Sequence, residues 1–188
     1  MAGGRSSRMG QDKATLIIEG KPLWQRQLDT LRAIAPAELI ISGRLDGPYA
    51  DCGVRILPDE QPGLGPLGGL ATVLRAAQHP LVLVLAVDQP GITPEWLTRL
   101  LSVAPAIPFL NGKFEPLAAV YPKSSGELAA RLLSEQRLAM RDFAEILLAA
   151  GEAQPFVVAG DDAPFFRNLN TPEDVRAFEA ERRERHAT

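Results

Sequence analysis

The feature that most constrains the fold is an uninterrupted aliphatic stretch in the middle of the chain, residues 81–87, with the sequence LVLVLAV. Because it carries no polar residue, it predicts a strand that is buried on both faces, as in parallel sheets covered by helices. Asp88 follows directly, at the strand end where open α/β sheets bind ligands. Asp88 could instead cap the next helix, but Thr93 and Pro94 offer a better cap for it.

Strand-like and helix-like segments alternate along the rest of the chain. This alternation predicts an α/β fold: one domain over residues 1–188, with a mostly parallel sheet, helices on both faces and a charged, fraying tail at residues 179–188. Strands are expected at residues 38–42, 54–57, 106–110, 117–121 and 156–159, and helices at residues 22–34, 73–77, 94–101, 126–134, 140–150 and from 172 onward.

Composition excludes several classes of function. With 188 residues, of which 46% are hydrophobic, the chain is long enough for one sizeable domain. Its net charge of -3 and the absence of a basic stripe argue against a nucleic-acid partner. Cys52 is the only cysteine, and His79 and His186 are the only histidines, which argues against disulfides, zinc clusters and a Ser-His-Asp triad. No leader or apolar run near 18 residues is present, so we expect a cytoplasmic protein without a membrane partner.

The opening segment, residues 1–13 (MAGGRSSRMGQDK), has the composition of an anion-binding loop. Its glycines allow close approach of the backbone to a ligand, and it combines them with two serines and three basic side chains. Arg8 could bind two phosphate oxygens at once, whereas Lys13 would act as a point charge. The spacing matches neither the Walker loop nor the G-x-G-x-x-G fingerprint. The alternative is a solvated, glycine-rich N-terminus.

Four stretches together resemble the molybdenum cofactor guanylyltransferase family, the MobA-like branch of the nucleotidyltransferases. They are the opening A-G-G-R-S-S-R-M-G-x-D-K, the Gly- and Pro-rich segment at residues 62–69, the D-x-P beginning at Asp88, and N-L-N-T-P-E at residues 168–173. The resemblance extends from the first residue to about Asp174. It implies a single-domain, Rossmann-like fold of the nucleotide-diphospho-sugar transferase type. Family members also carry a buried strand just before the opening loop, and this first strand is missing here.

The resemblance implies that the protein transfers GMP from GTP to the phosphate of molybdopterin, releases pyrophosphate and uses Mg²⁺. Transient contacts with molybdoenzymes or cofactor-delivery proteins are expected. The implied catalytic residues are Arg8, Lys13 and Asp88, and Asp88 is the implied metal ligand. The nucleotide side comprises Met1, Ala2, Gly3, Lys13, Ser42, Asp59 and Asp88, and the second-substrate side comprises Glu115, Asn168 and Asn170.

Several alternatives stay open on the residues alone. Asn168 and Asn170 could serve only to hydrogen-bond a loop backbone. The nucleotide could be CTP, or the acceptor a sugar or polyol phosphate, because contacts that select the base are often made by the backbone. A catalytically silent nucleotide-binding module and a purely structural interaction domain are the alternatives that are not enzymes.

Overall fold

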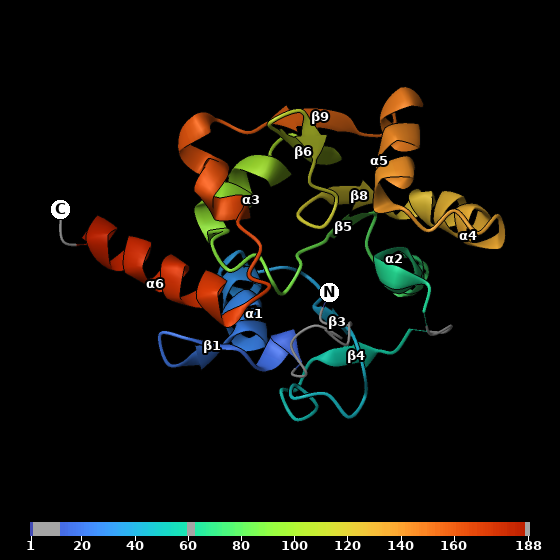
Figure 1. Ribbon diagram of the computed structural model, residues 1–188. Coiled ribbons are helices and arrows are strands. Elements are labelled where there is room, and N and C mark those ends of the chain that lie inside the picture. Colours follow the sequence, from blue (N-terminus) through green and yellow to red (C-terminus); the bar gives the residue numbers. More distant parts are fainter. Residues whose placement is uncertain (2–11, 60–62, 187–188) are drawn as a thin grey trace.

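The computed structural model describes residues 1, 12–59 and 63–186, and helices alternate with strands along the chain (Figure 1). The elements are η1 (Lys13–Thr15), β1 (Ile17–Ile18), β2 (Lys21–Pro22), α1 (Leu23–Ala33), β3 (Ile40–Ser42), β4 (Arg55–Leu57), α2 (Gly65–Ala76), β5 (Leu81–Leu83), α3 (Pro94–Leu101), β6 (Ala106–Leu110), β7 (Lys113–Phe114), β8 (Val120–Pro122), η2 (Lys123–Ser125), α4 (Gly126–Ser134), α5 (Met140–Ala149), β9 (Gln154–Val157), η3 (Gly160–Phe166) and α6 (Pro172–His186).

The largest sheet has the strand order β5-β8-β6-β7, and β9 pairs with β6. Among the described strands, β3–β4 and β6–β9 are parallel pairs, whereas β1–β2, β5–β8, β6–β8 and β6–β7 are antiparallel. The expectation of a mostly parallel sheet is therefore not confirmed. The reason is a hairpin: Asn111 and Gly112 adopt positive φ angles of 48° and 78°, which turn the chain back after β6 so that β8 returns antiparallel between β5 and β6.

Helices cover both faces of this sheet, as expected. Val82 and Tyr121 pack in a buried cluster with α2, α4 and α5, whereas Leu85 and Val120 pack in a second cluster with α3. Successive side chains of a strand point to opposite faces, so this division places one layer of helices on each side of the sheet. Figure 1 shows α2 and α4 on one side and α1 and α3 on the other.

The aliphatic stretch at residues 81–87 is extended, as predicted. It begins as β5, and its backbone then continues along the next strand: Val84 N donates to Ala119 O and Ala86 N donates to Leu117 O, both at 2.8 Å. The last strand, β9, begins at Gln154, two residues earlier than expected. Its second residue is a proline, which an outer strand that pairs with β6 alone tolerates.

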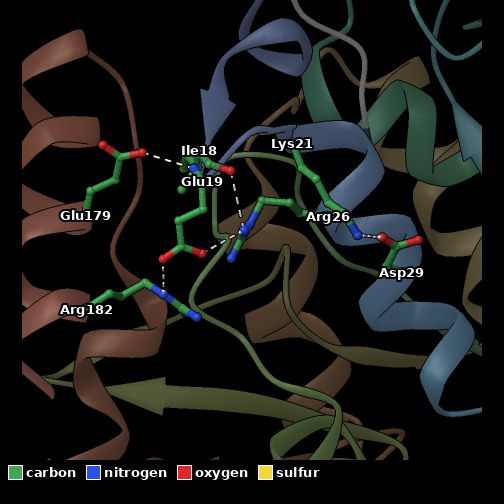
Figure 2. A network of polar contacts seen from close by, with 7 residues as sticks. All are labelled: Ile18, Glu19, Lys21, Arg26, Asp29, Glu179 and Arg182. Atoms are coloured by element: carbon green, nitrogen blue, oxygen red, sulfur yellow. Dashed lines mark hydrogen bonds and ion pairs between the residues drawn. The ribbon is translucent and has the colours of Figure 1, made fainter. Parts of the chain in front are cut away.

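The final helix, α6, continues through the expected tail to His186 and is attached to the β1–β2 hairpin by polar contacts (Figure 2). The Glu19 carboxylate accepts hydrogen bonds from Arg26 and Arg182, each at 3.0 Å. The backbone N–H of Glu19 donates to Glu179 at 3.0 Å. Among the described residues, no helix combines the length and the apolar character needed to cross a membrane.

Candidate active site

Three distant parts of the chain meet at the Lys13 side chain. Lys13 opens η1, whose start is capped by the Asp12 carboxylate, which accepts from Ala14 N at 3.0 Å. The Lys13 ammonium donates to Asp88 Oδ2 at 3.0 Å and to Asn170 Oδ1 at 2.5 Å. The side chains of Lys13 and Asp88 are about one-fifth exposed, at 23% and 22%. We call Lys13, Asp88 and Asn170 the Lys13 cluster.

Backbone contacts fix the position of Asn170 in this cluster. Leu169, fully buried, donates its N–H to the carbonyl of Asp88 at 2.8 Å. Asp174 then accepts from the N–H groups of Asn170 and Thr171, both at 2.8 Å, and Thr171 Oγ1 accepts from Asp174 N, which is a capping box at the start of α6. Because the Asn170 side chain accepts from Lys13 rather than from a loop backbone, its geometry favours a role in the site.

Asn168 is exposed on the same loop, two residues before Asn170. Glu115 is held next to the residue that follows Asp88: its carboxylate accepts from Gln89 Nε2 at 3.2 Å. Burial raises the pKa of the Glu115 carboxyl, the Gln89 hydrogen bond opposes this, and the negative charge of Asp88 adds to it. Glu115 is therefore close enough to Asp88 for their charges to interact.

Sequence reasoning missed two buried glutamines that shape the turn after the aliphatic strand. Gln27 is 5% exposed and donates from Nε2 to the carbonyls of Ala86 at 2.6 Å and Gln89 at 2.9 Å. Gln89 itself is 1% exposed. These hydrogen bonds hold the backbone on both sides of Asp88. The signal was a glutamine at an inward position of an amphipathic helix, where an apolar residue is usual.

A second group of predicted residues converges on α2. A Cβ atom added at Gly69 would lie 2.6 Å from Ser42 Oγ, 2.8 Å from Met1 Cε and 3.0 Å from Asp59 Oδ1. Ser42 ends β3 and is buried, and Asp59 follows β4. Burial raises the pKa of the Asp59 carboxyl, while a hydrogen bond from Ser42 opposes that rise. We call Met1, Ser42, Asp59 and Gly69 the Ser42 cluster.

Met1 connects the two clusters. Its ammonium donates to Leu85 O at 2.9 Å, and its carbonyl accepts from Val87 N at 3.1 Å, one residue before Asp88. Burial lowers the pKa of the Met1 amine to about 6, and the nearby Asp88 carboxylate partly opposes this shift. Of the other predicted residues, Ala2, Gly3 and Arg8 lie outside the described part of the chain.

The donor set at Asp88 fits a magnesium ion that arrives with a nucleotide. Mg²⁺ prefers hard oxygen ligands and usually takes one or two carboxylates, with phosphate oxygens and water completing its octahedron. Asp88 supplies such an oxygen at the end of a buried strand, next to a lysine that can neutralise phosphate charge. The arrangement can therefore align a polyphosphate and offset its charge.

Residues 1–148 match the family model described as the MobA-like NTP transferase domain. The chain belongs to the MobA-like NTP transferase family. Its relatives include probable molybdenum cofactor guanylyltransferases of Deinococcus radiodurans, 36% identical over 93% of this chain and 89% of the relative, and of Opitutus terrae, 33% identical over 93% and 90%. The molybdenum cofactor guanylyltransferase of Rhizobium meliloti is 32% identical over 96% of this chain and 88% of that protein.

Solved structures show that this MobA-like chain has a nucleotidyltransferase fold. Molybdopterin-guanine dinucleotide biosynthesis protein A from Archaeoglobus fulgidus superimposes with a TM-score of 0.77 at 23% identity, covering 97% of this chain and 96% of that one. The 2-C-methyl-D-erythritol 4-phosphate cytidylyltransferase of Thermus thermophilus superimposes with a TM-score of 0.71 at 22% identity, covering 91% and 94%. At these identities the likeness concerns the fold.

Proposed function

We propose that this MobA-like protein transfers GMP from GTP to the phosphate of molybdenum-molybdopterin, forming the guanine dinucleotide cofactor and releasing pyrophosphate. The names of the relatives support this reaction. The observation that carries it is the convergence of Lys13, Asp88 and Asn170, from three distant segments, within hydrogen-bonding distance at the end of the aliphatic strand. This position is where open α/β sheets bind nucleotides.

In the proposed reaction, an oxygen of the molybdopterin phosphate attacks the α-phosphorus of GTP. The bond from that phosphorus to the oxygen bridging the β-phosphate breaks, and its electron pair leaves with pyrophosphate. The attacking phosphate is already ionised near neutral pH, so the step needs no strong protein base. Catalysis then depends on alignment and on neutralising the charge of the phosphates.

Lys13 supplies much of this neutralisation. In the structure its ammonium is shared between Asp88 and Asn170, so it is already held at the site by two acceptors. When a triphosphate binds, Lys13 would contact its oxygens, and Arg8 would add a second cation with paired donors. Asp88 would hold a Mg²⁺ ion, which supplies further neutralisation of the phosphates.

The remaining residues divide between two substrates. We assign the Ser42 cluster, with Ala2 and Gly3, to the nucleotide, because the Ser42 hydroxyl and the Asp59 carboxylate place a donor and an acceptor beside Gly69 and the Met1 side chain. We assign Glu115, Asn168 and Asn170 to the acceptor side.

This role implies a cytoplasmic protein that meets molybdoenzymes or delivery proteins transiently and binds neither nucleic acid nor membranes. We also infer a Rossmann-like sheet, which the match to the MobA-like family supports.

Pyrophosphate release tests the proposal directly. With Mg²⁺ and molybdopterin present, GTP should give release, whereas CTP should give little. Preference for CTP, or turnover with a sugar phosphate in place of molybdopterin, would assign a different transferase. Binding of GTP without release would indicate a silent module.

Two aspartate variants make the assay specific for the site. Asp88→Ala should abolish magnesium-dependent release while the protein stays folded. Asp162→Ala is the matched control: Asp162 also forms an ion pair, with Arg99 at 2.7 Å, but it lies on η3 outside both clusters. Wild-type turnover in Asp88→Ala would remove Asp88 from the metal role.

A further inference from the structure

The turn that carries Asp88 lies just beyond the regular hydrogen bonding of the large sheet. Val84 N and Ala86 N still donate to carbonyls just before β8, whereas residues 87 and 88 form a turn. A side chain on a turn takes its direction from the contacts that fix the backbone around it. The residues that hold this backbone therefore decide where the Asp88 carboxylate points.

One buried amide, that of Gln27, bonds the backbone on both sides of Asp88. Its Nε2 donates to the carbonyl of Ala86, two residues before Asp88, at 2.6 Å, and to the carbonyl of Gln89, the residue after it, at 2.9 Å. These two bonds use both hydrogens of the amide. Gln27 lies within α1, so the bonds join the turn to a helix rather than to another loop.

The oxygen of the same amide indicates that Gln27 does more than fill space. Among the described residues, Gln27 Oε1 is buried and has no hydrogen-bond partner. A buried acceptor without a partner is unfavourable, and methionine would fill a similar volume without it. Turning the amide over would bring its oxygen against two carbonyl oxygens, which cannot donate to it. What the glutamine adds at this position is thus the pair of bonds to the Asp88 turn.

The same amide supports a second carboxylate through Gln89. The backbone carbonyl of Gln89 accepts from Gln27, and the side chain of Gln89, which is buried, donates to Glu115 at 3.2 Å. The backbone that Gln27 holds therefore carries both Asp88 and the residue that bonds Glu115.

We propose that Gln27 is a positioning residue for Asp88: by fixing the turn, it directs the carboxylate toward the metal ion that accompanies the nucleotide. This inference rests on the proposed function, in which Asp88 holds Mg²⁺. Removing a group that orients a metal ligand typically lowers metal affinity by about 10- to 100-fold. Loss of the Gln27 donors should therefore weaken the metal's contribution to nucleotide binding and spare the contacts that do not depend on Asp88.

The test measures how much Mg²⁺ strengthens GTP binding. The dissociation constant of GTP is determined by calorimetric titration with Mg²⁺ and again with EDTA, without molybdopterin so that no transfer occurs. The ratio of the two constants gives the metal contribution. Gln27→Met keeps a similar volume and helix propensity but removes both donors. It should reduce the ratio by about tenfold and leave the constant in EDTA within about twofold of the wild type.

Two comparisons separate positioning from general destabilisation. Ser125→Ala is the matched control: Ser125 is also buried and donates to a backbone carbonyl, that of Pro122 at 2.6 Å, but it lies outside both clusters. Ser125→Ala should keep the wild-type ratio. In an Asp88→Ala background, Gln27→Met should have no further effect on the ratio, because it acts through Asp88.

Amide exchange reports on the turn without any ligand. The N–H of Leu169 donates to the Asp88 carbonyl at 2.8 Å, so its exchange should be faster in Gln27→Met than in Ser125→Ala. Gln27→Asn gives a second variant should Gln27→Met fail to fold. Its amide is one methylene shorter, so it should change the ratio and the Leu169 exchange in the same directions.

Three results would overturn the proposal. An unchanged ratio in Gln27→Met and Gln27→Asn, together with a lost metal contribution in Asp88→Ala, would remove the role of Gln27 and leave the proposed function standing. Equal weakening of GTP binding with Mg²⁺ and with EDTA would show that Gln27 acts on the fold as a whole. If Mg²⁺ does not strengthen GTP binding even in the wild type, the metal role of Asp88 fails, and this inference fails with it.

Discussion

Removing the Lys13 ammonium gives the sharpest test of the candidate site. Lys13→Ala deletes the cation that bonds Asp88 Oδ2 at 3.0 Å and Asn170 Oδ1 at 2.5 Å. If Lys13 acts as a preorganised charge donor, its loss should cost about 2 to 4 kcal/mol of transition-state stabilisation, which is roughly a 30- to 1,000-fold fall in kcat/KM. Lys13→Ala should lower the stability of the fold much less. The ion pair between Lys13 and Asp88 is partly solvated, so it contributes about 1 kcal/mol or less to the free energy of unfolding, and Tm should fall by only about 2 to 4 °C.

Lys21→Ala is the matched control for this experiment. Lys21 also forms an ion pair, with Asp29 at 2.9 Å, but its side chain is 54% exposed and lies outside the Lys13 cluster. Pyrophosphate release should therefore be unchanged in Lys21→Ala and strongly reduced in Lys13→Ala. The reasoning is refuted if Lys13→Ala retains activity within about threefold of the wild type, or if both variants lose activity equally.

Two further predictions concern the Ser42 cluster. Gly69→Ala should weaken GTP binding by about tenfold or more, because the new methyl group would displace Ser42 or Asp59. Its Tm should stay nearly unchanged, because alanine is favoured over glycine in a helix by about 1 kcal/mol. The control is Gly126→Ala, whose new Cβ would lie no closer than 3.4 Å to a neighbour, Leu74 Cβ, and which should bind GTP normally in the same titration. The pKa of the Met1 amine falls from 8.0 to about 6 on folding, so between these pH values the unfolded state binds more protons than the folded state. The free energy of unfolding should therefore rise by about 2 kcal/mol from pH 6 to pH 8 in chemical denaturation. N-acetylated protein that shows the same rise would contradict this account.

Short sequence patterns predict those elements whose structure is determined by a few neighbouring residues. The aliphatic stretch at residues 81–87 could be buried only as a strand with both faces covered, and the structure confirms that it is extended and packed between two helical layers. Thr171 directly precedes Pro172 in the sequence, a pattern that predicts a helix cap, and Asp174 N does donate to its hydroxyl. The cap contact of Thr171 lies within three residues of sequence, and the aliphatic pattern of residues 81–87 is itself local, although its strand partners are distant.

Pairing between distant strands was not predictable in the same way. An Asn-Gly pair such as Asn111-Gly112 is typical of a hairpin turn, yet nothing in residues 117–121 shows that their strand returns between β5 and β6 rather than at an edge. The hydrogen bonds of Gln27, which span 59 and 62 residues, depend on where α1 packs against the sheet. The resemblance, rather than periodicity, identified Asn170, and only the folded structure shows that its side chain contacts Lys13.

The position of Asn170 also depends on how α6 packs against the rest of the protein. The free energies of its polar and apolar contacts show which of them hold it in place. The ion pair between Glu19 and Arg182 is partly exposed, so it contributes about 1 kcal/mol or less and weakens with salt. Leu169 and Phe178 are 0% and 5% exposed in a cluster with Ile18, and burying each contributes about 1.5 to 3 kcal/mol. Apolar packing therefore dominates the docking of α6. It follows that the Lys13 cluster keeps its geometry at salt concentrations that screen the surface ion pairs of this helix.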